Sequence, residues 1–280
     1  MLMMRILRYT FLISFLALIS SGLVSADAAH SAVNKSRQSS IEKSFQSEES
    51  GDHESEYKDY LAPDEIKALG KVHPRKHLKR SRISKAKPKA EPERKLIALT
   101  FDDGPHQNYT PQLLRILKER NVKATFFVVG VMAERYPYLI RAEFRSGHTI
   151  GNHTYHHPKL SEMAPMEISH EINTCGDAIE RITGIKPRYF RPSGGNYNGE
   201  VVSIVKSLGY KMVLWTLNSE DIANLGVTRI VSRIEQRSSN GGIILLHDGV
   251  EQTIAALPSI IDVLRSRGYE FVTIDELLGK

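Results

Sequence analysis

Short apolar runs recur along the chain from about residue 96, and stretches with helical periodicity separate them. The runs are rich in β-branched and aromatic side chains, which is typical of buried strands. The stretches between them have helical ends. Thr110 before Pro111 predicts an N-cap and a first-turn proline, and Gly184, Gly209 and Gly268 lie where helices are expected to stop. The seven predicted strands begin near Ile97, Ala124, His148, Arg188, Met212, Ile243 and Glu270.

This alternation over residues 95–280 predicts an α/β fold, in which parallel strands are joined by right-handed crossovers. A complete eight-stranded barrel typically needs roughly 250 residues, which is more than this region provides. We therefore expect a distorted, incomplete (β/α) barrel of about seven parallel strands. An open doubly wound sheet is the alternative. One domain accounts for this region, and the sequence shows no internal repeat.

Residues 1–26 have the pattern of a signal peptide. Two arginines precede an apolar stretch at residues 9–19, and small residues at 24–26 resemble a signal-peptidase site. The apolar stretch is shorter than the ~20 residues that span a bilayer, so a cleaved signal is favoured over a retained N-terminal anchor. We expect an exported protein that is secreted, periplasmic or associated with the cell envelope. The chain has one cysteine, so no internal disulfide is expected.

Residues 27–94 are rich in Ser, Glu, Lys and Pro without sustained periodicity, which predicts a disordered charged linker. Residues 71–95 carry 11 Lys and Arg against two Glu, a net charge of +9, whereas residues 1–70 carry seven against ten. Because the whole chain has a charge of +6, residues 96–280 have no net charge. The basic run predicts a solvated spacer, with contact to an anionic cell-wall or membrane surface as the alternative. It contains no aromatic residue for base stacking, so nucleic-acid binding is not expected.

Polar side chains follow five of the predicted strands. Because a parallel barrel brings the carboxyl ends of its strands to one face, we expect these side chains to lie close together. Two adjacent carboxylates after the first strand can divide their roles, one as a metal ligand and one as a base for water. The side chains after the first, third, fourth, fifth and sixth predicted strands are Asp102 with Asp103, His153, Arg191, Asp221 and His247.

A metal site is indicated by the two histidines His153 and His157. They are four residues apart, so one helical turn would place both imidazoles on the same side. With Asp103 they make a set of one oxygen and two nitrogen donors, which leaves positions for water and substrate as catalytic zinc sites do. A surface histidine cluster is the alternative for this segment alone, but the preceding Asp pair favours a metal site. His156 is expected to face away.

Five short motifs occur in order along the globular region: TFDDGP at 100–105, HTYHH at 153–157, RPSGG at 191–195, Trp215 with Asp221, and LLH at 245–247. In order and rough spacing they resemble the motifs of the NodB-type polysaccharide deacetylases, carbohydrate esterase family 4. The resemblance covers about residues 95–278. It implies a metal-dependent hydrolase that removes N-acetyl groups from a GlcNAc-containing polymer, such as peptidoglycan, chitin oligomers or an exopolysaccharide.

The resemblance also implies roles for the polar residues. Asp103, His153 and His157 would hold a divalent metal, usually Zn²⁺, with Co²⁺ or Ni²⁺ as alternatives. Asp102 would be the general base that acts on metal-activated water. His247 would be the general acid that protonates the leaving amine.

Further positions would support these groups. Arg191 would pair with the base, and Asp221 would orient the acid. A backbone N–H near Gly194, where relatives often have tyrosine, would stabilise the oxyanion. Leu245 and Trp215 would line an acetyl pocket, with core packing as the alternative for Trp215.

The fourth motif departs from the family pattern, which usually has two aspartates three apart followed by tryptophan. Here the positions are Asn218, Asp221 and Ile222. This departure leaves the saccharide preference open. The alternatives are an esterase for O-acetylated, xylan-type glycans and a catalytically silent saccharide-binding module. No coiled coil or other association element indicates an oligomeric state.

Overall fold

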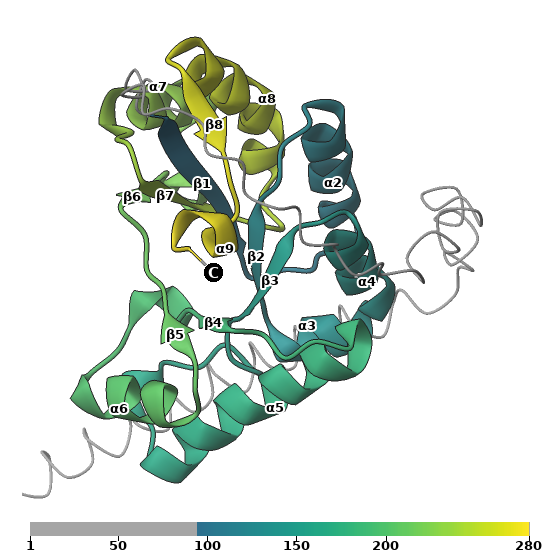
Figure 1. Ribbon diagram of the computed structural model, residues 1–280, viewed down its shortest axis with the longest axis vertical. Helices are drawn as coiled ribbons and strands as arrows, with labels where there is room; N and C mark the ends of the chain where they lie inside the picture. The colour runs from purple at the N-terminus through teal and green to yellow at the C-terminus, as the bar shows by residue number, and fades with distance from the viewer. Residues whose placement is uncertain (1–93, 280) are drawn as a thin grey trace, which may run out of the picture. The chain divides into compact units, whose positions relative to one another are not determined.

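The computed structural model describes residues 94–279 (Figure 1). The predicted signal peptide at 1–26 lies outside the described residues. So do the predicted linker at 27–94, apart from Arg94, and all but the last two residues of the basic run at 71–95. Within the described part, no helix combines the length and the apolar character that crossing a membrane requires.

Parallel strands form the centre of the fold. The sheet order is β5-β4-β3-β2-β1-β7-β6, with β8 beside the beginning of β1. The strands therefore follow chain order around a ring that is broken between β5 and β6, and the predicted incomplete barrel is confirmed. The strands are β1 (Lys95–Asp102), β2 (Thr125–Val128), β3 (Thr149–Asn152), β4 (Tyr189–Phe190), β5 (Lys211–Met212), β6 (Leu217–Asn218), β7 (Gly242–His247) and β8 (Tyr269–Phe271).

Helices connect the strands and most of them cover the outside of the sheet, whereas the last helix, Ile274–Leu277, packs on the other face against Ala98 and Phe127 (Figure 1). The α-helices are α2 (Thr110–Glu119), α3 (Gly130–Arg135), α4 (Pro137–Arg145), α5 (Pro165–Thr183), α6 (Gly199–Ser207), α7 (Val227–Arg237), α8 (Glu251–Ser266) and α9 (Ile274–Leu277). Three short 3₁₀ turns are η3 (Leu160–Glu162), η4 (Ser193–Gly195) and η5 (Asp221–Ala223).

The ends of the helices agree with the sequence in part. Gly184, Gly209 and Gly268 follow α5, α6 and α8 and have positive φ, as expected of glycines beyond a helix end. Thr110, however, is not an N-cap: α2 begins at Thr110 itself, and Tyr109 precedes it without a capping side chain. The Thr110 hydroxyl instead donates a hydrogen bond to Asp248.

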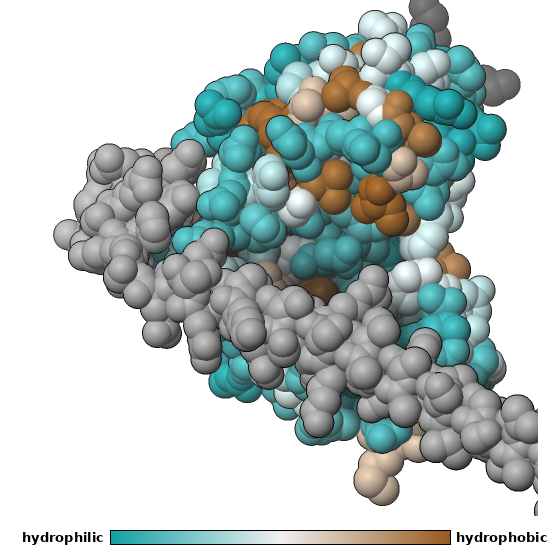
Figure 2. Space-filling model, turned by 180° about the vertical axis from the view of Figure 1, so that it is seen from behind, coloured by the Kyte–Doolittle hydropathy of each residue, from teal (hydrophilic) through white to brown (hydrophobic). Residues whose placement is uncertain are grey.

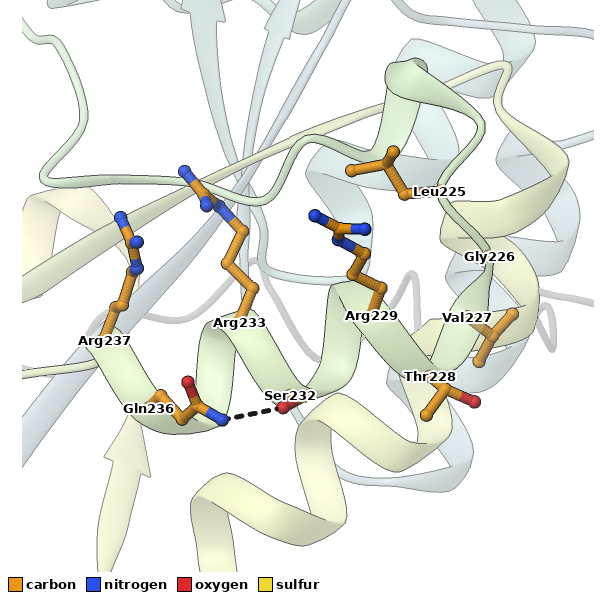
Figure 3. Close-up of a pocket in the computed structure, with 9 residues that line it drawn as sticks. All are labelled: Leu225, Gly226, Val227, Thr228, Arg229, Ser232, Arg233, Gln236 and Arg237. Carbon is orange, nitrogen blue, oxygen red and sulfur yellow. Dashed lines mark hydrogen bonds between the residues drawn. The ribbon is translucent and has the colours of Figure 1, made fainter.

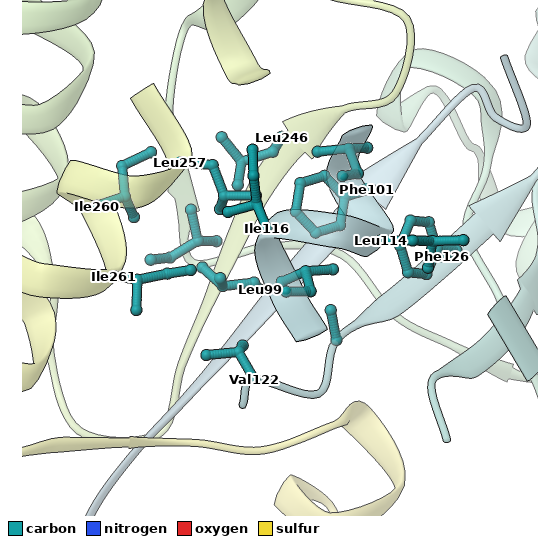
Figure 4. Packing of buried hydrophobic residues seen from close by; sticks show 14 of the residues in the cluster. Leu99, Phe101, Leu114, Ile116, Val122, Phe126, Leu246, Leu257, Ile260 and Ile261 are labelled. Carbon is teal, nitrogen blue, oxygen red and sulfur yellow. The ribbon is translucent and has the colours of Figure 1, made fainter. Parts of the chain in front are cut away.

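The central strand β1 is buried from Ile97 to Asp102 because sheet neighbours and helices surround it. Its register places Asp102 between Phe127 of β2 and His247 of β7. Figure 4 shows the core on one side of this strand, where side chains of β1, β2 and β7 meet those of α2 and α8. The labelled side chains include Leu99, Phe101, Leu246, Leu257 and Ile261. A rigid, dry sheet therefore carries the polar groups at its strand ends.

The described surface has a different character from this core. Figure 2 shows one face, on which hydrophobic residues lie interspersed among hydrophilic ones. The most exposed large apolar side chains are Met166 and Ile222, at 83% and 65%.

Candidate active site

A buried ion pair joins the ends of β1 and β4. The Arg191 Nη1 donates to Asp102 Oδ1 at 2.6 Å, and both side chains are almost wholly inaccessible to solvent, at 0% and 4% exposed. The same nitrogen donates to Thr100 Oγ1 at 2.8 Å. An arginine buried in this way needs its charge balanced and its N–H groups satisfied.

The remaining N–H groups of Arg191 also have hydrogen-bond acceptors. Its Nε and Nη2 donate to the carbonyl oxygens of Val213 and Leu214, each at 3.1 Å. Its guanidinium carbon lies 4.1 Å from the centre of the Phe127 ring. The guanidinium is thus fixed in position, and it fixes the Asp102 carboxylate in turn.

The three predicted metal ligands lie together. Their candidate ligand atoms are all within 4.8 Å of one another. Asp103 Oδ1 lies 3.4 Å from His153 Nε2 and 3.2 Å from His157 Nε2. Asp102 Oδ2 lies 3.6 Å from His153 Nε2, so the Arg191-paired carboxylate borders the same group.

The segment that carries the two histidines is a loop and not the helical turn expected from their spacing. Thr154 and His157 both have left-handed backbone conformations, with φ of 71° and 61°. The Thr154 amide donates to Asn152 Oδ1 at 2.9 Å, and the His157 amide donates to Thr154 Oγ1 at 3.1 Å. The imidazoles of His153 and His157 still converge, with ring centres 5.0 Å apart, because these local bonds turn the chain back.

Glu171 of α5 holds this loop from the other side. Its carboxylate accepts the amide hydrogens of Tyr155 and His156, at 3.0 and 2.8 Å. It also lies 2.7 Å from His156 Nδ1. His156 therefore faces α5 and takes no part in the three-residue cluster, as expected.

The donor set fits a divalent metal such as Zn²⁺. His153 Nδ1 lies 2.8 Å from the Arg191 carbonyl oxygen, which can only accept, so Nδ1 carries the proton. The lone pair of Nε2 then points toward Asp103. Metal-ligating histidines usually have this outer hydrogen bond, and two imidazoles with one carboxylate are a donor set that zinc prefers.

Electrostatics favour a cation here. Burial acts to raise the pKa of Asp103, but its interactions with the neighbouring imidazoles of His153 and His157 outweigh burial and place that pKa well below its usual range. The hydrogen bond to Asp103 is the main cause that raises the pKa of His157, against the opposing effect of burial. Asp103 is therefore ionised at neutral pH and brings negative charge to the donor set.

A second carboxylate supports His247 at the end of β7. His247 Nδ1 lies 2.8 Å from Asp221 Oδ1, and the His247 amide donates to Asp221 Oδ2 at 2.7 Å. Thr253 Oγ1 also donates to Oδ2, at 2.6 Å. Burial acts to lower the pKa of His247, but the hydrogen bond and charge of Asp221 outweigh burial and raise that pKa above its usual value.

The predicted substrate contacts have mixed environments. Gly194 is exposed and left-handed (φ 58°) in the turn after Arg191. The side chain of Trp215 is partly exposed and packs closely on Gly195, where a Cβ atom would lie only 2.6 Å from the ring. Leu245 is 3% exposed and paired in register with Thr100, beneath His247 on the same face of β7.

The divergent fourth motif lies on the segment from β6 to η5. Asn218 uses its side chain to accept the Glu220 amide at 2.8 Å. Ile222 is exposed, so it occupies a surface position beside the buried Asp221. The support for His247 is thus kept, and the altered positions face outward or bond locally.

Asp248 is a polar residue of this region that the sequence did not single out. It is 4% exposed, and its amide donates to the Asp102 carbonyl oxygen at 2.8 Å. Its carboxylate accepts from Thr110 and packs on Gly104, where a Cβ would lie 2.5 Å from Oδ2. Asp248 therefore connects the loop that carries Asp103 to the end of β7. Its neighbour His247 was the only signal for it in the sequence.

Comparison with known proteins agrees with this geometry. A family model described as "Polysaccharide deacetylase" matches residues 89–213. A peptidoglycan-N-acetylglucosamine deacetylase of Bacillus cereus is 41% identical over 189 residues, which cover 66% of this chain and 88% of that protein. A chitooligosaccharide deacetylase of Azorhizobium caulinodans is 34% identical, covering 62% and 90%. Peptidoglycan-N-acetylglucosamine deacetylase PgdA of Listeria monocytogenes is 37% identical, but the match spans only 41% of its length.

Solved structures give the same result. Peptidoglycan deacetylase PdaC from Bacillus subtilis superposes with a TM-score of 0.63 at 35% identity, over 68% of this chain and 92% of that one. A CE4 family pseudoenzyme from Bacillus anthracis superposes with a TM-score of 0.64 at 30% identity, over 68% and 67%. The chain belongs to the NodB-type polysaccharide deacetylases, the hydrolases of carbohydrate esterase family 4.

We predict that His157→Ala weakens Zn²⁺ binding more than about 100-fold, since loss of outer-shell partners alone costs 10- to 100-fold. The matched control is His156→Ala, which removes an imidazole that contacts Glu171 instead. Chelator competition measures both affinities. Equal affinity of the two variants would contradict the proposed ligand set.

Proposed function

We propose that this protein is a metal-dependent N-deacetylase that hydrolyses acetamido groups of a GlcNAc-containing polymer. The observation that carries the proposal is the convergence of three groups at the strand ends. These are the donor set of Asp103, His153 and His157, the Arg191-paired carboxylate of Asp102, and the Asp221-supported imidazole of His247. A hydrolytic site needs a metal ligand set, a base and an acid, and these three groups are proposed to supply them.

The nitrogen-rich donor set makes Zn²⁺ the proposed ion, with Co²⁺ or Ni²⁺ as alternatives. When bound, such an ion polarises the acetyl carbonyl and lowers the pKa of water toward about 7. Asp103 would supply negative charge to the ion. His153 would offer Nε2 as the ligand atom, because the Nδ1 proton of His153 is donated to the Arg191 carbonyl oxygen. Asp248, through Gly104, keeps Asp103 in place.

The chain's own groups move the protons. Asp102 takes a proton from the attacking water, whose oxygen forms a bond to the acetyl carbon. A backbone N–H near Gly194 stabilises the charge on the carbonyl oxygen. His247 then gives its proton to the amide nitrogen as the carbon–nitrogen bond breaks, so that acetate and a free amine leave. Leu245 and Trp215 supply apolar surface for the acetyl methyl group.

The substrate is proposed from the relatives, which act on peptidoglycan and on chitooligosaccharides. Residues 1–26 are proposed to direct export, which would bring the enzyme to such polymers. Binding of residues 71–95 to an anionic wall or membrane surface is the corresponding proposal for the basic run.

The proposal predicts that the Zn²⁺-loaded chain releases acetate and free amine in equal amounts from N-acetylglucosamine oligomers or solubilised peptidoglycan. NMR measures acetate, and an amine-reactive dye measures the second product; a chelated sample is the control. If the chain releases acetate from an O-acetylated glycan and produces no free amine, it is the esterase of the alternative hypothesis. Glycan binding without acetate from either substrate would assign a silent module, which the similarity to a pseudoenzyme makes a specific alternative.

The rate should fall on the alkaline side as His247 loses its proton. Because Asp221 raises the pKa of His247, the acid form persists above the usual histidine range. Asp221→Asn removes that charge and should move the alkaline limb of kcat/KM to lower pH. An NMR titration of His247 should show the same shift. An unchanged alkaline limb in a folded variant would exclude His247 as the acid.

A further inference from the structure

A basic groove runs along α7 on the outer side of the segment that follows β6. Three arginines, Arg229, Arg233 and Arg237, line it at intervals of four residues, and its volume is about 620 Å³. In Figure 3 their side chains extend from α7 toward the neighbouring segment that includes Leu225. Four residues rise about 6 Å along a helix, so the three side chains form a row about 12 Å long on one face.

The middle arginine is bound to the protein. Arg233 Nη2 lies 2.6 Å from Glu220 Oε1, and its Nε donates to the Asn218 carbonyl oxygen at 2.8 Å. Arg229 and Arg237 are exposed, and within residues 94–279 no carboxylate lies within 4.0 Å of either guanidinium. These two cations therefore have no neutralising carboxylate at ion-pair distance within the described residues.

The groove adjoins the support of the general acid. Its lining continues through Leu225 and Gly226, which follow η5, and η5 begins with Asp221. Gln252 joins the two regions, because it accepts the Gly226 amide at 2.7 Å and donates to the Asp221 carbonyl oxygen at 3.5 Å. The divergent Asn218 lies on the same segment. The groove therefore begins beside the support of the general acid, at Leu225 and Gly226, and runs along α7 toward Arg237, which precedes the beginning of β7. A long substrate bound at the strand ends would meet the groove at its Leu225 end.

The side chains that line the groove favour a ligand that carries both an anionic group and neighbouring hydroxyl groups. A guanidinium binds a carboxylate through two parallel hydrogen bonds. Thr228, Ser232 and Gln236 add neutral donors and acceptors of the kind that sugar hydroxyls use, and Gln236 already donates to Ser232 at 2.9 Å. A neutral oligosaccharide offers no anionic group that could pair with Arg229 and Arg237.

We propose that the α7 groove is a second binding site, which holds carboxylate groups of an acidic glycan strand while the acetylated sugar lies at the metal-binding side chains. This inference rests on the proposed deacetylase function and names its substrate class as a carboxylate-bearing glycan, such as peptidoglycan with its lactyl and peptide carboxylates. The site raises the efficiency on such strands through binding, without a part in the chemical step.

The test is the double variant Arg229→Gln/Arg237→Gln in the full chain, which leaves the Arg233–Glu220 pair intact. Kinetics are compared on peptidoglycan fragments with free carboxylates, on the same fragments with amidated carboxylates, and on N-acetylglucosamine oligomers. Loss of two exposed ion pairs should lower kcat/KM about fivefold. The fall should come from a higher KM and should occur only with the free-carboxylate fragments. Added salt should lower the wild-type preference for those fragments and leave the variant unaffected.

The matched control is Arg115→Gln/Lys206→Gln, which makes the same change in charge on the exposed faces of α2 and α6. An equal fall in this control, or an equal fall on all three substrates, would overturn the proposed groove. Displacement by a glycerol-phosphate polymer but by no carboxylate-bearing fragment would do so as well, because the site would then belong to a phosphate ligand.

Failure of the groove and failure of the catalytic proposal are distinguishable. If the wild type releases no acetate from any substrate, the deacetylase function fails. Calorimetry on the same Zn²⁺-loaded chain then measures binding of free-carboxylate against amidated fragments. A preference that the double variant loses supports the groove alone, and equal binding of the two fragments overturns it.

Discussion

The pairing of Arg191 with Asp102 is the interaction on which the rest of the site depends. Neither side chain is accessible to water, so each charge relies on the other and on the surrounding hydrogen-bond partners. Removal of one partner from such a pair typically costs about 3–5 kcal/mol, because the remaining charge is left buried. The carboxylate that is proposed to do the chemistry is therefore also part of what stabilises the fold.

Arg191 links two functions through one residue. Its guanidinium holds the proposed base, while its backbone carbonyl sets the tautomer of His153. The strand register then places His247 directly beside Asp102. Because these links pass through buried backbone and not through flexible surface chains, the base, the ligand set and the acid are held in a fixed arrangement before any substrate arrives.

Much of this arrangement could be predicted from the sequence, because apolar runs mark buried strands and each functional group follows such a run. Strand β6 could not, since Leu217–Asn218 has only two residues and no run of its own. The loop through Thr154 and His157 could not either. Spacing alone does not reveal its left-handed residues, and the amides between them are held by Glu171, which is distant in sequence. For the same reason Asp248 was missed: its partner Thr110 is distant in sequence, and only folding brings the two together.

The most direct test of this account is the rate of acetate release by Asp102→Asn loaded with Zn²⁺. The variant keeps the shape of the side chain and all three proposed ligands, so it should bind the ion as the wild type does. A general base contributes about 10²- to 10⁴-fold, and the rate should fall by at least the lower figure. Near-UV circular dichroism confirms that the variant is folded. Wild-type activity in a folded, Zn²⁺-loaded Asp102→Asn protein would contradict the assignment of the base and, with it, the central role of the Arg191–Asp102 pair.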